Sequence, residues 1–179
     1  YITYVKDGYI NQSDIEHYKK KPVEYQGRYG STSDDGENYS AGVRYSKDGK
    51  YICYPTDVNY GDDGVEFRLN MQKVGKTEEP VKIDSSVTSY TILDNNKILY
   101  KKAGNDTLYI NDKKGNKEKI ASDVEYFYLD SDQKNIVWSE SNGDGTINVC
   151  QQDVALKKEK KTLAKDVDSF YASSDLKYV

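Results

Sequence analysis

The chain has 179 residues, of which 36% are hydrophobic and 31% charged, and its net charge is −4. This length suits one domain, or two small ones. Its cations are nearly all Lys, with only Arg28, Arg44 and Arg68, whereas specific nucleic-acid recognition usually needs a basic face with arginines. We therefore expect no nucleic-acid partner.

The 18 Tyr favour many short strands over a helical bundle, because aromatic rings fit pleated, half-buried surfaces. The fold class predicted from composition is all-β. No run is long and apolar enough for a transmembrane helix, so we expect no membrane insertion by this chain. The chain starts at Tyr1 without Met or a signal sequence, which indicates a processed or partial product.

A repeat is the main signal along the chain. Residues 43–54, 90–100, 126–138 and 170–179 share alternating aromatics, an acidic turn, a Lys and an apolar triplet, and residues 1–4 match the end of a fifth copy. The first apolar residue after the Lys recurs at intervals of 38 to 50 residues, at Ile2, Ile52, Ile98, Ile136 and Val179. A Val precedes each full copy, at Val43, Val87, Val124 and Val167. Periods of this length, with several strands each, are typical of propeller blades.

Each period divides into four expected strands, A to D, by period-2 alternation and turn residues. Strand A follows the Val and strand B is the apolar triplet. Strand C covers 67–71, 108–111 and 147–150, and strand D covers 80–83, 119–120 and 161–163. The sequence therefore predicts a β-propeller of about four blades with four antiparallel strands each.

The segment after residue 12 carries conflicting signals. Ser13 and Glu16 form a capping-box pattern and Pro22 could end a helix. The repeat phase instead places Ile15 and His17 on strand C and residues 22–25 on strand D, and we predict strands.

The two ends of the chain are complementary, with strand B at 1–4 and strand A at 168–179. Residues 1–179 then form a single propeller domain closed from four blades, or a fragment of a larger ring, which we favour.

The unit Ser-x-Asp-Gly-Lys-x-Ile-x-Tyr at 46–54, with the closing Lys-Ile-Ala-Ser-Asp-Val at 119–124, resembles TolB-like β-propeller repeats. The likeness covers residues 41–179, and less closely 1–25. It is strongest to the Tyr- and Lys-rich versions in surface proteins and lipoproteins of Gram-positive bacteria. The resemblance implies blade architecture and supplies no catalytic residues.

The sequence shows little catalytic or metal-binding chemistry. Cys53 and Cys150 lie in different blades and lack zinc-type spacing, so we interpret both as small buried hydrophobes without a disulfide. His17 is the only His, and no Gly-x-Ser-x-Gly motif accompanies it. We predict no enzyme activity, no metal and no cofactor.

The acidic, Gly-rich stretches 59–64 and 141–146 lie between strands B and C, where Asn-Gly and Asp-Gly form ordinary turns. A Ca²⁺ site is the less favoured alternative, because neither has the EF-hand spacing. An insertion at about 26–39 lengthens one D–A connection. Because D–A and B–C connections emerge on the same face of a propeller blade, we predict a binding face there. Its candidate residues are Arg28, Tyr29, Asp34, Asp35, Tyr60, Asp62, Asp63, Asn142 and Asp144.

We thus expect a non-enzymatic binding or scaffold module, extracellular or on the bacterial cell surface, that recognises a protein, peptide or glycan. The alternative is a non-catalytic propeller part of a larger hydrolase, such as a peptidase or polysaccharide-degrading enzyme.

Overall fold

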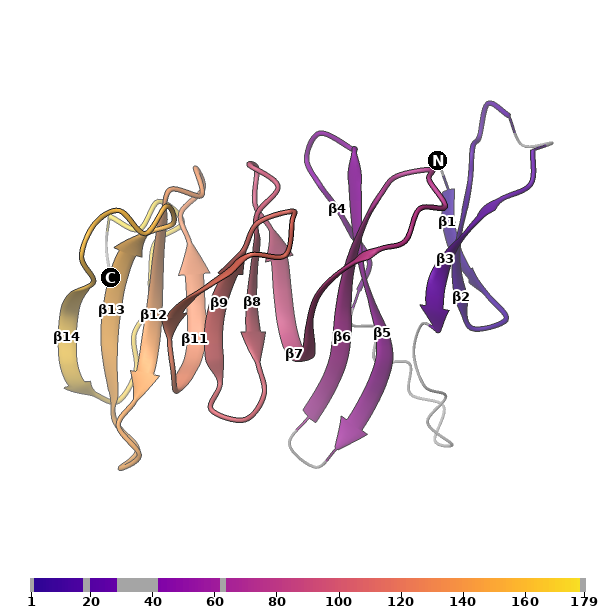
Figure 1. Ribbon diagram of the computed structural model, residues 1–179. Coiled ribbons are helices and arrows are strands. Elements are labelled where there is room, and N and C mark those ends of the chain that lie inside the picture. Colours follow the sequence, from indigo (N-terminus) through magenta and orange to yellow (C-terminus); the bar gives the residue numbers. More distant parts are fainter. Residues whose placement is uncertain (1, 18–19, 29–41, 62–63, 178–179) are drawn as a thin grey trace. The chain divides into compact units, whose positions relative to one another are not determined.

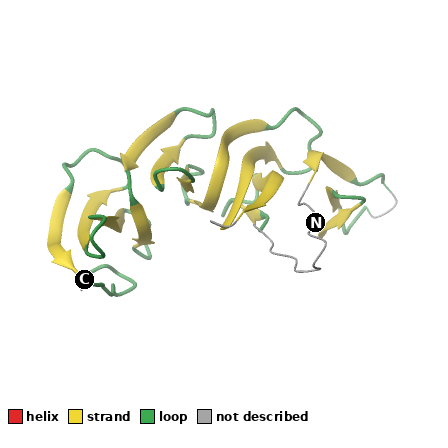
Figure 2. Ribbon diagram, turned by 90° about the horizontal axis from the view of Figure 1, so that it is seen from below, coloured by secondary structure: helices red, strands yellow, loops and turns green. Residues whose placement is uncertain are grey.

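The computed structural model describes residues 2–17, 20–28, 42–61 and 64–177. These residues form strands, turns and loops and contain no helix (Figures 1 and 2). None of them belongs to a helical segment with the length and apolarity needed to cross a membrane. The chain divides into two compact units, Tyr1–Ala103 with Ile110–Lys117 and Gly104–Tyr109 with Glu118–Val179.

The first unit begins with a three-stranded antiparallel sheet in the order β1-β2-β3. These strands are Ile2–Lys6, Tyr9–Ser13 and Val23–Arg28. The next five strands are consecutive neighbours, each paired with the next and antiparallel to it. They are β4 (Arg44–Tyr45), β5 (Tyr51–Gly61), β6 (Gly64–Lys73), β7 (Val81–Ile92) and β8 (Ile98–Lys102).

Strands β9 (Thr107–Asn111) and β10 (Lys117–Ala121) follow in the same hydrogen-bonded order, so that β10 ends the series. The second unit contains an antiparallel sheet in the order β11-β12-β13-β14 (Figure 1). Its strands are Val124–Leu129, Asn135–Ser141, Ile147–Asp153 and Lys161–Val167.

From β4 to β14 the strands follow the predicted A-B-C-D order. One pair of predicted strands forms a single element. In β7, strand D of the second repeat and strand A of the third are continuous: residues 81–87 pair with β6 and residues 87–92 with β8. A register shift near Asp84 lies in the part of β7 that pairs with β6, and the whole strand belongs to one seven-stranded sheet.

The Val that marks each repeat follows a residue with a left-handed backbone. Gly42, Ser86, Asp123 and Asp166 all have φ between 51° and 67°. Gly, Asp and Asn accept this conformation more readily than most residues. The pattern before the Val is therefore a backbone requirement of the D–A connection.

The apolar triplet of strand B forms the core, as the sequence predicts. Ile52, Ile98, Ile136, Val137 and Trp138 are fully buried. Both cysteines are free and buried, Cys53 on β5 and Cys150 on β13, which confirms their placement on strands B and C.

The prediction for Ile15 and His17 is wrong. Strand C of the first repeat is β2, which ends at Ser13, and residues 15–17 lie in the following turn. An Asp7-Gly8 hairpin turn, with φ of 53° and 82°, brings the chain back directly after β1. Strand C therefore starts at Tyr9, earlier than the repeat phase indicated.

The predicted final strand A is also wrong for its described part. Residues 168–177 form no strand, and they pair with no strand in the part of the chain that the structure describes. Leu176, Phe170 and Ala172 instead pack on a cluster that includes Val137 and Val149. The A–B turn persists there, because Leu176 has φ 52° and its N–H donates to Ser173 O at 2.9 Å.

Candidate functional site

In both units a B–C connection lies against a D–A connection. The N–H of Ala103 donates to Ser86 O at 2.8 Å in the first unit, and the N–H of Ser141 donates to Asp123 O at 2.8 Å in the second. Both acceptors are the residues with left-handed backbone before the Val. Within each unit, the repeat thus brings a B–C connection and a D–A connection together. The predicted binding face requires this proximity.

The predicted candidates fall in several places. Tyr29, Asp34, Asp35, Asp62 and Asp63 lie outside the described residues, as does most of the 26–39 insertion. Arg28 is the last residue of β3. Tyr60 is half-buried in β5, where it pairs with Val65 of β6. Asn142 and Asp144 belong to the second unit, where both contact the Thr146 hydroxyl.

Asn142 and Asp144 stabilise their own hairpin. The Asp144 carboxylate accepts hydrogen bonds from the Thr146 N–H at 2.9 Å and the Thr146 hydroxyl at 2.7 Å. Asn142 Nδ2 donates to Thr146 Oγ1 at 2.8 Å and to Asp166 Oδ1 at 3.2 Å. Among the described residues, no group of three or more His, Cys, Asp or Glu is arranged to hold a metal ion. These contacts favour the hairpin interpretation of 141–146.

The sequence did not reveal an open groove of about 670 Å³ in the second unit. Residues 118–123, from β10 and the turn after it, form one wall. Glu140, Gln152, Leu156 and Lys160 form the other. Side chains of a strand alternate between its two faces, so a wall of six consecutive residues must include the strand's backbone. The groove therefore follows the main chain of β10.

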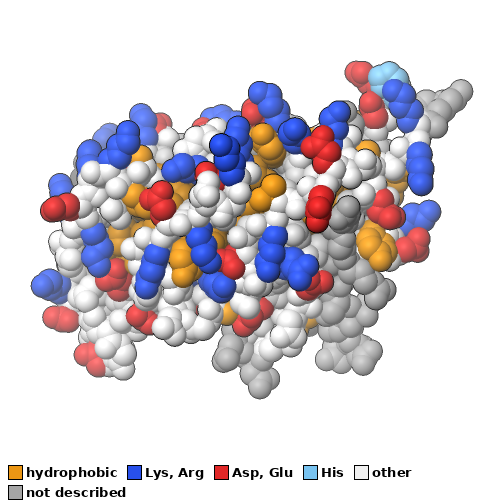
Figure 3. All heavy atoms as spheres, in the orientation of Figure 1, with side chains coloured by type: hydrophobic (Ala, Val, Ile, Leu, Met, Phe, Trp, Pro, Cys, Tyr) orange, Lys and Arg blue, Asp and Glu red, His pale blue; other side chains and the backbone are white. Residues whose placement is uncertain are grey.

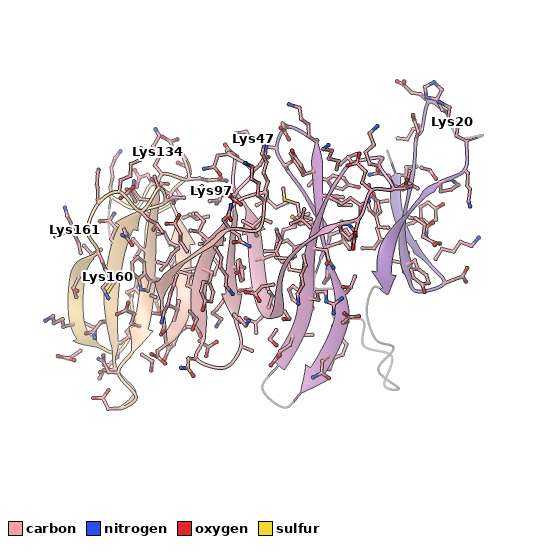
Figure 4. All side chains as sticks on the ribbon, viewed as in Figure 1. Lys20, Lys47, Lys97, Lys134, Lys160 and Lys161 are labelled. Carbon is pink, nitrogen blue, oxygen red and sulfur yellow. The ribbon has the colours of Figure 1, made fainter. Side chains whose placement is uncertain are left out.

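An ion pair lies in this groove. Lys160 Nζ donates to both Glu140 oxygens, at 2.9 and 3.0 Å, and Trp138 Nε1 donates to Glu140 Oε1 at 2.9 Å. The hydrogen bond and charge of Glu140 raise the pKa of Lys160, against a smaller effect of burial. Figure 4 labels Lys160 beside Lys161, the first residue of β14. The fully buried Trp138 thus fixes the Glu140 carboxylate, and Glu140 fixes Lys160.

The groups near this groove that could carry chemistry are a thiol, a hydroxyl and an ion pair. Burial and the Glu140 charge raise the pKa of the nearby Cys150 thiol, which keeps it protonated and unreactive. The described lining holds the Ser122 hydroxyl and no His. Glu140 is already engaged by Lys160 and Trp138.

The surrounding surface carries mixed charge. In Figure 3, Lys and Arg side chains are interspersed with Asp and Glu over the described residues of each unit. The charges on this face of the protein are therefore not of one sign. The sequence signal that could have pointed to it is Ala121, a small residue where the preceding repeat has Asp84.

No family model and no curated protein sequence matches the chain. Two similar solved structures are an oligogalacturonate lyase in complex with manganese and a eukaryotic initiation factor. The first has a TM-score of 0.56 at 15% identity, over 90% of this chain and 49% of that one. The second has a TM-score of 0.54 at 9% identity, over 97% of this chain and 45% of that one.

Both of these structures contain β-propellers, and this chain has the same all-β propeller architecture. It spans about half the length of each of them. Identities this low establish the fold alone.

Proposed function

We propose that the chain is a non-enzymatic binding module of TolB-like propeller repeats, of the Tyr- and Lys-rich kind found in Gram-positive surface proteins. Its partner is an extended peptide segment of another protein, met outside the cell or at its surface. The groove along β10 is the observation that carries this proposal.

Three features of the groove support a peptide. In the described part of the chain, β10 has one hydrogen-bonded neighbour, β9, and ends its series. Its main chain borders the groove through residues 118–121. An extended peptide can add to such an edge through main-chain hydrogen bonds, with side-chain pockets providing specificity. The fixed Glu140–Lys160 pair then offers one acceptor and one donor group to that peptide.

A displayed library of random peptides, selected on the 179-residue protein, tests this proposal. Ala121 is 7% exposed and lies in the groove wall. We expect selected peptides to lose at least about tenfold in affinity with Ala121→Phe. They should bind normally to Ala155→Phe, an exposed site in the next turn. Bound peptide should also slow hydrogen exchange of the β10 amides.

Other results would contradict the proposal. Peptides that bind both variants equally, or that leave β10 exchange unchanged, would show that the groove is not the site. Cleavage of a selected peptide by the 179-residue protein would contradict a non-enzymatic module. An α/β-hydrolase domain in the full-length gene would favour the alternative, a non-catalytic propeller part of a larger hydrolase.

A further inference from the structure

A second site, in the first unit, stands apart from the β10 groove. It is a pocket of about 360 Å³ lined by Gly49, Lys50, Tyr51, Lys73, Val74 and Lys76. A fourth cation, Lys113 Nζ, lies 5.8 Å from the centre of the Tyr51 ring. We call these four lysines and Tyr51 the lysine pocket. The chain as a whole is acidic, with net charge −4, so this local excess of cations is unusual for it.

The repeat shows that Lys73 is an exception at its position. Strand-pairing register places Lys73 opposite Tyr51 and Asp153 opposite Asn135, which makes Lys73 and Asp153 equivalent. Asp14 and Asp112 likewise follow strand C in the other two repeats. Three of the four copies therefore have Asp where the second has Lys.

The Asp in those three copies stabilises the turn after strand C. Asp14 accepts from the Glu16 N–H at 3.0 Å, and Asp112 from the Lys114 N–H at 2.8 Å. Asp153 accepts from the Lys158 N–H at 2.6 Å. Lys has no acceptor and cannot make these bonds. The second repeat therefore has a cation, Lys73, at a position where the other repeats have a carboxylate that stabilises the turn.

Other bonds hold this turn, and the fourth repeat has equivalents of two of them, from Gln152 Nε2 to Lys158 O and from the Val154 N–H to Lys134 O. Gln72 Nε2 donates to the carbonyls of Lys76 and Glu78, both at 2.7 Å. The N–H of Val74 donates to Lys50 O at 2.9 Å, and the N–H of Gly75 to Gln12 Oε1 at 2.9 Å. The turn is therefore fixed before any ligand arrives, which lowers the entropic cost of binding.

The nearby acids leave most of the positive charge available. Asp48 approaches Lys50, and Glu78 approaches Lys73, each at 3.6 Å and with exposed side chains. Exposed pairs of this kind are weak. Lys76 and Lys113 form no ion pair with any residue that the structure describes. Four cations thus stand beside two acids, Glu78 and Asp48, and the Asp48 carboxylate is also engaged by the Ser46 hydroxyl and the Lys50 N–H.

We propose that the lysine pocket binds an acidic carbohydrate. Tyr51 and Val74 offer an apolar surface to the C–H face of a sugar ring, and Lys50, Lys73 and Lys76, which line the same pocket, supply cations for its carboxylates. Small anions such as phosphate need cations but no apolar surface, and an acidic peptide has no flat C–H face for the ring. The site and its ligand are independent of the peptide groove.

Calorimetric titration with alginate oligosaccharides, which are chains of uronic acids, tests the proposal. Neutral cello-oligosaccharides, inorganic phosphate and an oligo-Glu peptide are the comparison ligands. We expect alginate to bind, more weakly as NaCl rises because exposed charges are screened. The comparison ligands should bind at least about tenfold more weakly.

Two variants restore residues that another repeat already uses, so both should fold. Lys73→Asp returns the turn carboxylate and Tyr51→Asn copies Asn135. Each should weaken alginate binding by about tenfold or more. The control Lys161→Asp makes the same change of charge at an exposed residue of β14 and should leave binding within about twofold.

No binding of alginate to the unaltered protein would overturn the proposal. So would equal binding of phosphate, oligo-Glu or the neutral sugar, or a loss in Lys161→Asp as large as in Lys73→Asp. Because the peptide groove is in the other unit, its failure or success is measured separately with Ala121→Phe.

Discussion

The third and fourth repeats carry different charges at two equivalent positions, one on strand B and one at the start of strand D. Strand register pairs Val87 with Lys102 in the third repeat and Val124 with Glu140 in the fourth, so Lys102 and Glu140 are equivalent. Lys117 and Lys160 each stand seven residues before the Val that marks the next repeat, Val124 and Val167. The third repeat therefore brings two cations together where the fourth has a cation and an anion.

A single buried carboxylate compensates in the third repeat. Asp84 lies three residues before Val87, where the fourth repeat has Ala121 before Val124. Its oxygens accept from Lys102 Nζ and Lys117 Nζ, both at 2.9 Å, and from the Tyr100 hydroxyl at 3.0 Å. Burial alone would raise the pKa of Asp84, but the hydrogen bonds from Lys117 and Lys102 hold it well below its ordinary value.

The comparison teaches how a repeat can gain an open site. In the fourth repeat the ion pair is complete without a third group, so position 121 can be a small Ala, and the groove along β10 opens beside it. In the third repeat the equivalent position is filled by a carboxylate that the structure needs. The charge on strand B thus goes with the residue at this position of the D–A connection, Asp84 beside Lys102 and Ala121 beside Glu140.

The largest expected effect tests whether strand B forms the core in each of the two repeats. Ile98 and Ile136 are both fully buried on strand B. Ile98→Ala and Ile136→Ala should each lower the free energy of unfolding by about 2–5 kcal/mol, measured by urea denaturation. Val5→Ala, at a half-exposed position, is the control and should cost about 0.5 kcal/mol or less. A cost near zero at Ile136 would contradict the assignment of strand B.

The next effect concerns Asp84 alone. Asp84→Ala removes the carboxylate and leaves Lys102 and Lys117 facing each other. We expect a loss of about 2–3 kcal/mol in urea denaturation, because a buried charged network loses its common acceptor. Partial exposure of both lysines limits the loss. Asp132→Ala, in an exposed pair, should change stability by less than about 1 kcal/mol, and equal losses would show that Asp84 is an ordinary surface acid.

A rescue variant sharpens the comparison. Asp84→Ala with Lys102→Glu reproduces the Ala, Glu and Lys of the fourth repeat. It should recover about 1–2 kcal/mol of the loss caused by Asp84→Ala. Asp84→Ala with Lys102→Gln removes only the repulsion and should recover less. If both double variants are no more stable than Asp84→Ala, the two repeats do not use equivalent positions.

The dependence of stability on pH follows from the lowered pKa of Asp84. Its folded pKa lies below that of the unfolded chain, ordinarily about 3.9. Its contribution is therefore complete above about pH 4 and is lost as the pH falls through the folded value. Between about pH 5 and 2, the free energy of unfolding should fall more steeply for the unaltered protein than for Asp84→Asn. If the free energy of unfolding changed with pH in parallel for the two proteins, Asp84 would not be the cause, because the other acidic groups are common to both.

The smallest effect is expected in the fourth repeat. Glu140→Gln keeps an acceptor for Trp138 Nε1 but removes the charge opposite Lys160, whose side chain is 44% exposed. The cost should be about 1 kcal/mol or less and should shrink at high salt. A cost as large as that of Asp84→Ala would show that the Glu140–Lys160 pair matters as much for stability as the Asp84 network, which contradicts the comparison.

The sequence by itself determined the repeat and the strands within it. Strand B was readable because an apolar triplet after a turn and a Lys recurs in phase, and the structure buries Ile52, Ile98 and Ile136 completely. The Val before each repeat was readable for the same reason, whereas the left-handed backbone of the residue before it was found only in the structure. These are local signals, set by turn chemistry and side-chain alternation over a few residues. The early start of strand C at Tyr9 was also encoded locally, in Asp7-Gly8, although repeat spacing pointed elsewhere.

Only the tertiary structure decided which charges meet. Asp84 is 33 residues from Lys117 and 18 from Lys102, and Lys113 reaches Tyr51 from another repeat. Nothing in local periodicity specifies such contacts, because they depend on strand register and on the register shifts along β7, which pairs with both β6 and β8. The groove along β10 and the lysine pocket arise in the same way, from residues that are distant in sequence and adjacent only once the strands have paired.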